Sequence, residues 1–314
     1  MKWKKLGLIF KSNLQFDWNK NGFASVPTVF KIGKEVLRIY FASRDVKNRT
    51  NISFIEVEAD NPKNISYIHN KPVLTPGKAG MFDDCGVMPS HVLNLNGEVW
   101  MYYIGWNVRN TIAYHNSIGL AKSKDNGITF EKFSEGPLFD RNYQEPYFSA
   151  APYVLIENRT WKMWYLSNTK WVTFKGKSEP FYHIKYAESK NGIDWKRQGK
   201  VAIDFKDKNE CGIVRACVIK DTNHYKMFYS YRHLQNYRTS KKNSYRIGFA
   251  KSTNGVEWTR KDDEVGIDIS KNGWDSKMIE YPFVYDHKNN RYMIYNGNTF
   301  GKTGFGYAIL KNNT

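Results

Sequence analysis

The sequence contains few cysteines, and their number and spacing exclude two common uses of this residue. Cys85, Cys211 and Cys217 are an odd set in a chain without a secretion signal, which argues against a disulfide framework. No Cys-x-x-Cys or His-x-x-x-His spacing supports a zinc site, so we expect no metal and no cofactor. Two interpretations stay open: small buried thiols, which we favour, or a metal or redox pair formed by Cys85 and Cys211.

The sequence also lacks long hydrophobic runs and the motifs of several enzyme classes. No apolar stretch approaches the roughly 20 residues that span a bilayer, so we expect no transmembrane segment. The N-terminal apolar stretch runs only from Leu6 to Phe10, shorter than the about 7–15 residues of a signal peptide, and we expect a cytoplasmic protein. No phosphate-binding glycine loop, nicotinamide fingerprint or kinase signature occurs.

Acidic residues are scarce relative to basic ones. The 48 Lys and Arg residues outnumber the 30 Asp and Glu residues, and the formal net charge is +18. This excess favours anionic partners, such as charged glycans, nucleotide sugars, a phospholipid surface or nucleic acid. The charge is spread in short pairs such as Lys4-Lys5 and forms no stripe with stacking aromatics, so we expect no nucleic-acid partner. A nucleic-acid-binding protein or scaffold is the third-ranked alternative.

A sequence repeat organises the whole chain. The pattern acid-Cys-Gly occurs at Asp84-Cys85-Gly86 and at Glu210-Cys211-Gly212, with an offset of 126 residues. Five apolar runs each contain an anchoring valine, and steps of 63, 62, 64 and 66 residues separate Val29, Val92, Val154, Val218 and Val284. The two acid-Cys-Gly sites therefore occupy equivalent positions two repeats apart.

Each repeat predicts a meander of four antiparallel strands. The anchoring run is followed by a second run such as "VWMYYIGWN" and a third such as "SIGLAKS", with the alternation and side chains of strands. Three of the third runs lead into Asn-Gly turns that suit tight hairpins: Asn126-Gly127, Asn191-Gly192 and Asn254-Gly255. Five such meanders predict an all-β fold, a five-bladed β-propeller that forms one domain over residues 1–314. Two β-sandwich domains are the alternative, but they do not explain five evenly spaced copies.

The fifth repeat has no fourth strand of its own at the C-terminus. The N-terminal "WKKLGLI" resembles "WKRQGKV", which begins the fourth strand of the third repeat at Trp195. We therefore predict that residues 3–10 complete the last blade and close the ring, which would remove an open sheet edge.

The predicted blades bring two sets of loops to one axial pocket. The loops that lead into the first strands (here called lead-in loops) carry acids in four of the five repeats, and the loops between second and third strands carry Trp, Asn and Arg. Paired carboxyls can divide the roles of proton donor and base or nucleophile, while Trp stacks on sugars and polar groups bind hydroxyls. The candidate catalytic residues are Asp84, Glu145, Glu210 and Glu280. The candidate substrate-binding residues are Asp83, Arg44, Asp45, Trp106, Asn107, Trp171, Arg215, Tyr231, Arg232 and Asn298.

With its five meanders, its acidic lead-in loops and its "YAESKNGIDW" and "FAKSTNGVEW" hairpins, the chain resembles the five-bladed propeller glycoside hydrolases. That superfamily includes family 43 and 32 glycosidases and family 130 phosphorylases. The resemblance implies an axial pocket in which Glu210 or Glu145 is the proton donor and Asp84 the base or nucleophile. Family 43 and 32 enzymes also place an Asp on the first blade's inner strand, where this sequence has Ala24-Ser25-Val26, and Glu280 is the candidate replacement.

These observations favour an enzyme that cleaves or transfers a glycosidic bond. The missing first-blade acid puts ordinary hydrolysis in doubt and leaves phosphorolysis or transfer open. We expect a carbohydrate substrate. The basic charge of the chain favours an anionic or lipid-linked glycan, and surface-polysaccharide synthesis is a process that uses such glycans. A glycan-binding propeller without catalysis is the alternative from another functional class.

Overall fold

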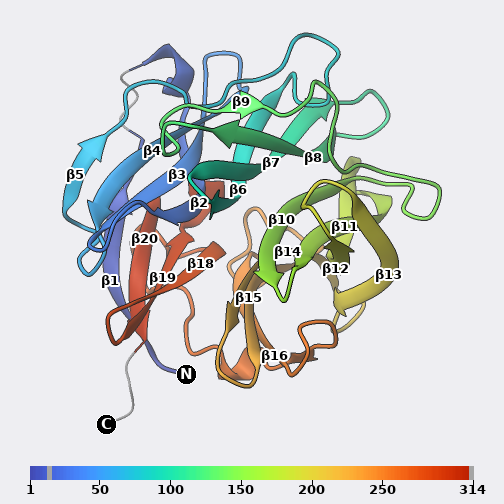
Figure 1. Cartoon of the computed structure of the whole chain (residues 1–314). Coiled ribbons are helices and arrows are strands. Elements are labelled where there is room, and N and C mark those ends of the chain that lie inside the picture. The colour runs from blue at the N-terminus through green and yellow to red at the C-terminus, as the bar shows by residue number, and fades with distance from the viewer. Residues whose placement is uncertain (13–15, 311–314) are drawn as a thin grey trace.

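The computed structural model describes residues 1–12 and 16–310, and they form an all-β structure (Figure 1). One eight-stranded sheet has the order β2-β3-β4-β6-β7-β8-β9, with β5 paired to β4. Its strands are β2 (Gly22–Lys31), β3 (Val36–Arg44), β4 (Thr50–Glu58), β5 (Ile65–Ile68), β6 (Gly86–Leu95), β7 (Glu98–Val108), β8 (Tyr114–Ser123) and β9 (Glu131–Lys132). Every pairing is antiparallel except the single bridge between Thr50 and Gly86, so the sheet consists of two meanders joined at one point.

A second eight-stranded sheet repeats this plan. Its order is β10-β11-β12-β14-β15-β16-β17, with β13 paired to β12. Its strands are β10 (Ser149–Glu157), β11 (Thr160–Phe174), β12 (Lys177–Ser189), β13 (Trp195–Ile203), β14 (Glu210–Lys220), β15 (Tyr225–His233), β16 (Arg246–Ser252) and β17 (Thr259–Arg260). One parallel bridge between Tyr182 and Gly212 again joins two antiparallel meanders. The predicted strands of the first four repeats are therefore present.

The two ends of the chain meet in a four-stranded sheet of order β1-β20-β19-β18. Its strands are β1 (Trp3–Phe10), β18 (Glu280–His287), β19 (Asn290–Asn296) and β20 (Phe305–Leu310). Figure 1 shows the blue strand β1 beside the red strand β20, and the pairing is antiparallel. The N-terminal strand therefore pairs with the last strand of the fifth repeat, as predicted, while closure of a five-bladed ring by this strand stays a prediction. Short helical turns are η1 (Asp17–Asn19), η2 (Asp262–Glu264) and α1 (Asn298–Gly301).

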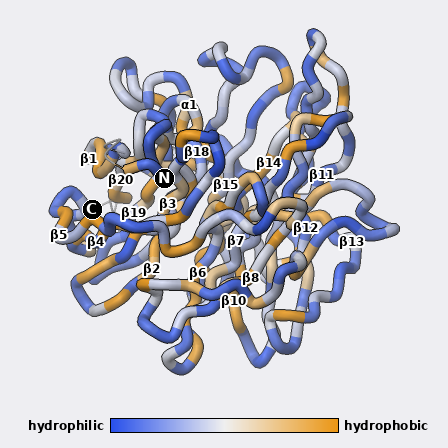
Figure 2. The backbone as a smooth tube through the Cα atoms, turned by 90° about the horizontal axis from the view of Figure 1, so that it is seen from above, coloured by the Kyte–Doolittle hydropathy of each residue, from blue (hydrophilic) through white to orange (hydrophobic). Residues whose placement is uncertain are grey.

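The first strands of the repeats contact one another in a cycle. Strand β2 contacts β6, β6 contacts β10, β10 contacts β14, β14 contacts β18, and β18 contacts β2. The first strands therefore surround a common centre, with the later strands of each meander outside them. Hydrophobic stretches recur along the strands throughout the chain (Figure 2), and the largest buried side chains include Trp164, Tyr102 and Tyr186.

Each first strand is interrupted by a β-bulge at the same place. Four bulges contain a residue in the left-handed region, with φ between 48° and 64°: Val26, Ala151, Arg215 and Tyr281. Each lies three residues before an anchoring valine, and Pro89 occupies this position in β6, where the register also shifts. Left-handed geometry costs a non-glycine residue about 1–2 kcal/mol, so the surrounding structure must hold these bulges in place. A bulge redirects the side chains beside it, here those at the start of each first strand.

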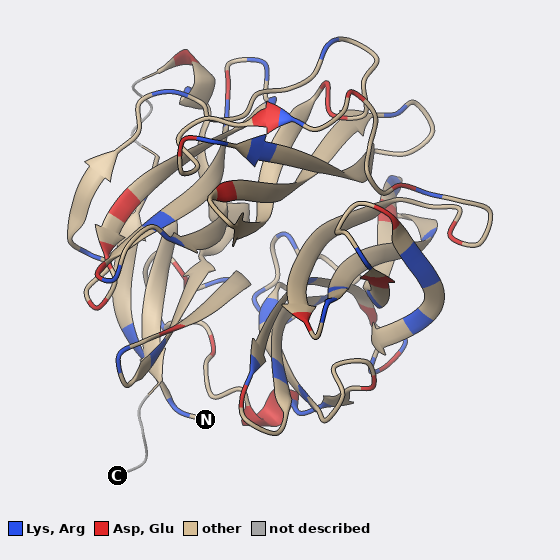
Figure 3. Cartoon of the chain, viewed as in Figure 1, with Lys and Arg blue, Asp and Glu red and all other residues tan. Residues whose placement is uncertain are grey.

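Two further observations concern the chain as a whole. None of the described helices has the length and hydropathy to cross a membrane. Lys and Arg are scattered over strands and loops rather than gathered in one segment (Figure 3), in agreement with their spread in the sequence.

Candidate active site

The lead-in carboxylates of three repeats are each bound by a tyrosine and a cation. The tyrosine is on the second strand, twenty residues after the acid, and donates its hydroxyl: Tyr103 to Asp83 at 3.1 Å, Tyr165 to Glu145 at 2.9 Å, and Tyr295 to Asp275 at 3.0 Å. The cations are Lys132 at 2.6 Å from Asp83, Lys185 at 3.1 Å from Glu145, and Lys5 at 2.7 Å from Asp275. All three acids are at most 5% exposed, so these contacts hold buried charges in compensated pairs.

Glu210 in the fourth repeat belongs to a variant of the same arrangement. Arg260 on β17 binds its two carboxylate oxygens at 2.7 and 2.9 Å, and the backbone N–H of Lys206 donates to it at 2.8 Å. Arg260 also binds Asp262, which accepts the hydroxyl of Tyr229 at 2.5 Å. The tyrosine of this repeat is thus bound to an acid after the fourth strand instead of the lead-in acid.

The first repeat has neither the tyrosine nor the acid. Val29 pairs with Ile39 as Val92 pairs with Met101, so Phe41 is the counterpart of Tyr103. Phe41 is 1% exposed and its ring lies 5.0 Å from that of Phe10. A lead-in acid here would have no hydroxyl to bind it, which accounts for its absence from this repeat. The recurrence of acids in the other lead-in loops therefore has a structural explanation, and the predicted catalytic roles of Glu145 and Glu210 stay predictions.

Asp84 is held differently from its neighbour Asp83. One oxygen of its half-buried carboxylate accepts the N–H of Gly80 at 2.9 Å, and the other is buried without a hydrogen-bond partner among residues 1–12 and 16–310. The adjacent Cys85 is free and half-buried, and its thiol pKa is raised, chiefly by burial and also by the Asp84 carboxylate. Asp84 thus keeps an oxygen that no described group occupies.

Glu280 is the most unusual of the predicted acids. It begins β18, directly before the bulge residue Tyr281, and its side chain is 0% exposed. Neither carboxyl oxygen has a hydrogen-bond partner in the described part of the chain. Burial raises its pKa well above the ordinary value, although the charge of Arg232 and the backbone N–H of Phe300, which lies near the carboxyl but outside hydrogen-bond geometry, act in the opposite direction. Burial thus favours the protonated form of this carboxyl, the form that a proton donor needs.

A buried cluster of tyrosines around Arg232 lies beside Glu280. The Arg232 Nε donates to the hydroxyls of Tyr182 and Tyr245 at 3.1 Å each, and these hydroxyls lie 2.5 Å apart. The guanidinium also donates to the sulfur of Cys211 at 2.7 Å and lies 3.8 Å from the ring centre of Tyr237. The guanidinium of Arg232 is 1% exposed and has no carboxylate in a salt bridge among the described residues. This guanidinium lies close enough to Glu280 for its charge to affect the pKa of that carboxyl.

Several predicted substrate-binding residues join this region. Trp171 is half-buried, and its ring meets Tyr114 edge-on at 5.5 Å within the hydrophobic cluster that contains Tyr182 and Tyr245. Arg44 lies 5.5 Å from the ring centre of Trp106 and close enough to Tyr281 for their charges to interact. Burial lowers the pKa of Arg44. The structure thus places Trp171 against the cluster of tyrosines that surrounds Arg232, and it places Arg44 near both Trp106 and Tyr281.

Other predicted binding residues fix loops or strands. Asp45 accepts the backbone N–H groups of Lys47 and Arg49 at 2.9 Å, which closes its own turn. Asn298 similarly accepts the N–H of Lys277 at 2.7 Å, and Asn107 donates to the carbonyl of Met81 at 3.3 Å. Tyr231, on β15, is half-buried, and Arg260 lies 5.6 Å from its ring centre.

Arg215 has a central structural position. It is 1% exposed and donates to Thr28 Oγ1 at 2.7 Å, Pro27 O at 3.1 Å and Ser90 Oγ at 3.2 Å. One guanidinium on β14 therefore ties together the first strands β2 and β6. This position agrees with a structural role for Arg215 rather than a contact with ligand.

The sequence analysis did not identify the tyrosines of the cluster. Tyr182 and Tyr245 are 63 residues apart, and each directly precedes the third-strand run of its repeat. Tyr281 directly follows Glu280 at a bulge position. These repeat-equivalent positions were a usable signal, because Tyr at the start of a third strand lies on the same face as the lead-in loops.

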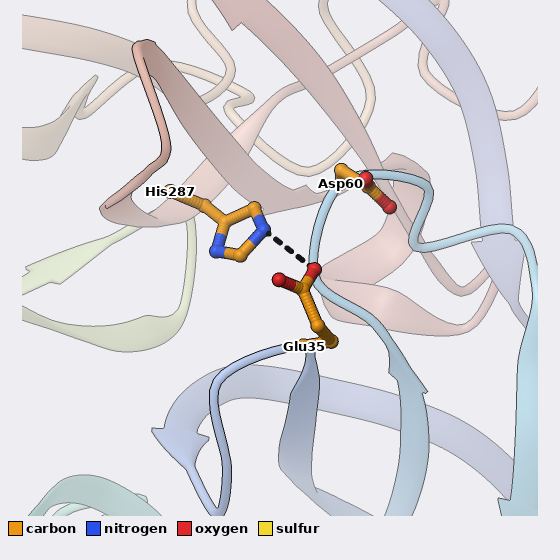
Figure 4. A group of neighbouring side chains, drawn as sticks. All are labelled: Glu35, Asp60 and His287. Atoms are coloured by element: carbon orange, nitrogen blue, oxygen red, sulfur yellow. Dashed lines mark ion pairs between the residues drawn. The ribbon is translucent and has the colours of Figure 1, made fainter.

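One cluster of carboxylates and histidine has a spacing that a metal ion would accept. Glu35 lies between β2 and β3, Asp60 follows β4, and His287 ends β18 (Figure 4), and His287 Nε2 is 3.3 Å from Glu35. However, the ammonium of Lys288 lies 3.0 Å from both carboxylates and supplies the compensating charge. It also lowers the pKa of Glu35 and of Asp60. The cluster therefore acts as an ion-pair network that joins the first and last repeats.

Comparison with known proteins gives a family and a fold. No family model matches the chain. It is 37% identical over 312 residues to the uncharacterized protein MT1551 of Mycobacterium tuberculosis strain CDC 1551, covering 99% of this chain and 100% of that protein. The uncharacterized protein Rv1502 of strain H37Rv is 36% identical over the same length, with the same coverage.

Solved structures with a similar fold are glycoside hydrolases. One glycoside hydrolase matches with a TM-score of 0.72 at 20% identity, covering 97% of this chain and 90% of the other. A thermostable family-43 glycoside hydrolase matches with a TM-score of 0.66 at 19% identity, covering 91% and 87%. A GH32 β-fructofuranosidase of Bombyx mori matches with a TM-score of 0.62 at 14% identity, covering 92% and 61%. The chain belongs to the family of the mycobacterial proteins MT1551 and Rv1502, and it has the fold of these glycoside hydrolases.

Proposed function

We propose that the chain is a single five-bladed β-propeller over residues 1–314, closed by β1 in the last blade. The cycle of contacts among the five first strands supports this closure, because each first strand has a neighbour on both sides. The parallel bridges from Thr50 to Gly86 and from Tyr182 to Gly212 are the points where adjacent blades touch.

On this scaffold, the proposed activity is cleavage or transfer of a glycosidic bond, with Glu280 as the proton donor. The observation that carries the proposal is the environment of this carboxyl, which is fully buried, lacks a hydrogen-bond partner among the described residues and has its pKa raised by burial. A protonated carboxyl in a cluster of aromatic residues is suited to protonate a leaving-group oxygen. Glu145 and Glu210 are less suited, because Lys185 and Arg260 already bind their carboxyl groups.

Asp84 is the proposed second carboxyl of the reaction. Its unoccupied oxygen can accept a proton from water, phosphate or a sugar hydroxyl while that nucleophile bonds to the anomeric carbon. In the same step, the glycosidic C–O bond breaks and Glu280 transfers its proton to the departing oxygen. Phosphorolysis and transfer differ from hydrolysis only in the nucleophile, so the same two residues serve all three reactions.

The aromatic and basic residues near Glu280 fit a carbohydrate substrate. Trp171 and Trp106 offer ring faces, and Arg232 and Arg44 offer charge-assisted hydrogen bonds. We propose an anionic or lipid-linked glycan of surface-polysaccharide synthesis and a cytoplasmic location, in keeping with the net charge of +18.

A screen of aryl glycosides tests the proposed activity. The panel contains furanosides and pyranosides, neutral and acidic, each with and without phosphate. We expect release by the wild type and its loss in Glu280→Gln, with Glu131→Gln, an exposed acid on β9, as the matched control. Release in water alone indicates a hydrolase, and release that requires phosphate indicates a phosphorylase. Release that is unchanged in Glu280→Gln would contradict the role of Glu280.

A glycan-binding propeller without catalysis is the second candidate. It is favoured by the pairing of the lead-in acids, which leaves few carboxylates for chemistry. It predicts sugar binding that survives Glu280→Gln and is lost in Trp171→Ala, without turnover of any glycoside. Turnover of a single substrate would exclude it.

A further inference from the structure

A basic cavity lies between three loops of the third and fourth repeats. Its volume is about 340 Å³, and its walls come from the β11–β12 hairpin, the segment before β14 and the loop between β15 and β16. The residues that define its chemistry are Phe174, Lys208, Asn209, His233, Lys242 and Asn243. A cavity of this size, with one aromatic face and convergent polar groups, suits a small ligand.

The cavity carries two lysines that form no ion pair within residues 1–12 and 16–310. Neither Lys208 nor Lys242 forms an ion pair with any described residue, whereas lysines such as Lys162 and Lys226 are paired at 2.6 Å. No carboxylate lines the cavity. The nearby Asp207 is engaged in its own turn, where its carboxylate accepts the N–H of Asn209 at 2.7 Å. Unpaired ammonium groups around a concave surface attract an anion.

The other lining groups add neutral hydrogen-bonding capacity. The Nδ1 of the half-buried His233 is itself buried and has no hydrogen-bond partner in the described part of the chain. Asn209, Asn243 and Phe174 line the same space, and the Nδ2 of Asn243 also donates to the carbonyl of Gln235 at 2.8 Å. Amide groups can form hydrogen bonds with sugar hydroxyls, and an aromatic ring face can pack against sugar carbons. A bare inorganic anion would need only the lysines.

The loop between β15 and β16 connects this cavity to the proposed active site. His233 directly follows Arg232, and the N–H of Leu234 donates to the carbonyl of Asn209 at 2.9 Å. The same loop carries Tyr237, whose ring lies 3.8 Å from the Arg232 guanidinium inside the tyrosine cluster. One loop therefore contributes to both the cavity and the cluster beside Glu280.

We propose that this cavity binds a sugar unit that carries an acidic group, either a carboxylate or a phosphate. Lys208 and Lys242 would bind the acidic group, and His233, Asn209 and Asn243 the hydroxyls. The inference that this cavity is a substrate subsite rests on the proposed function. If the cavity is such a subsite, the substrate is an acidic glycan.

Direct binding measurements test this inference without turnover. Isothermal titration calorimetry would compare glucuronate and glucose 1-phosphate with uncharged glucose, on the full chain. We expect both acidic sugars to bind more tightly than glucose. The order of affinity of the two acidic sugars shows whether the site prefers a carboxylate or a phosphate. The double variant Lys208→Gln/Lys242→Gln should bind the acidic sugars at least about fivefold more weakly, since each exposed ion pair contributes modestly.

The control is Lys20→Gln/Lys124→Gln, which makes the same charge change at exposed lysines outside the cavity. If both double variants bind the acidic sugars equally more weakly than the wild type, the effect comes from the net charge of the protein, and the inference is overturned. Equal binding of glucose and the acidic sugars would also overturn it. Glycoside turnover without charge discrimination would refute this subsite while leaving the proposed function intact. Acidic-sugar binding at the two lysines without turnover of any glycoside would support the binding site and refute the proposed function.

Discussion

The buried ion pair between Glu210 and Arg260 provides a direct test of whether the lead-in acids are structural. Glu210 is 2% exposed and receives two hydrogen bonds from the guanidinium, at 2.7 and 2.9 Å. Replacing Arg260 by Met would leave Glu210 with one remaining donor, the N–H of Lys206. Leaving one member of a buried pair uncompensated destabilises a protein by about 3–5 kcal/mol, and we expect a loss in that range.

A double-mutant cycle separates this pair from its surroundings. Urea denaturation would give the unfolding free energies of Arg260→Met, Glu210→Gln and the double variant. Because each single change removes the same contact, we expect the double variant to lose about 1–3 kcal/mol less than the sum of the singles. Losses that add to within about 0.5 kcal/mol would show that the pair is not coupled and refute the structural assignment.

The same variant also distinguishes a structural from a catalytic Glu210. If the carboxylate only supports the fold, Glu210→Gln should lose stability but keep its turnover per folded molecule. Normal stability with turnover reduced by about 100-fold or more would identify Glu210 as a reacting group instead.

Three further predictions concern Glu280, Arg215 and β1. Folded Glu280 keeps its proton at a pH where the unfolded side chain has lost it, so stability falls as pH rises from the unfolded pKa toward the raised folded pKa. Relative to Glu280→Gln, the wild type should lose about 1.4 kcal/mol per pH unit in that window, and parallel urea-denaturation profiles between about pH 5 and 8 would contradict this. Arg215→Met should lower the unfolding free energy by at least about 2 kcal/mol, because buried acceptors on β2 and β6 lose their donor, and an unchanged melting temperature would be inconsistent with that. Removal of residues 1–10 exposes the edge of β20 and unpairs Asp275, so size-exclusion chromatography should show oligomers, and a stable monomer would argue against closure by β1.

Much of the fold follows from local sequence signals. Hairpin turns, strand alternation and the spacing of the anchoring valines depend on nearby residues, and they predicted the meanders correctly. The pairing of β1 with β20 was also predictable, because a fourth strand was missing at one end and a similar segment stood at the other. The bulges at positions such as Tyr281 were not, since non-glycine residues in the left-handed region have no clear sequence signature.

The site was harder to predict because burial and pairing decide which acids are free. In the sequence, Glu145 is a catalytic candidate like Glu280, and Asp83 is a substrate-binding candidate, yet tyrosines and lysines from other strands bind both acids. The constant separation of twenty residues between acid and tyrosine was visible in the sequence, and it would have predicted that these acids are bound by tyrosines. The isolation of Glu280 depends on which groups do not reach it, and no sequence pattern records that.

The dependence of turnover on the leaving group tests the role of Glu280 as proton donor most directly. A dinitrophenyl leaving group departs without protonation, whereas an alkyl alcohol needs the acid. The kcat/KM of wild type and Glu280→Gln would be measured with both kinds of glycoside of the best sugar from the screen. The account predicts a loss of about 100-fold or more with the alkyl glycoside and a loss below about tenfold with the dinitrophenyl glycoside. Equal losses with both substrates, or no loss with either, would contradict it.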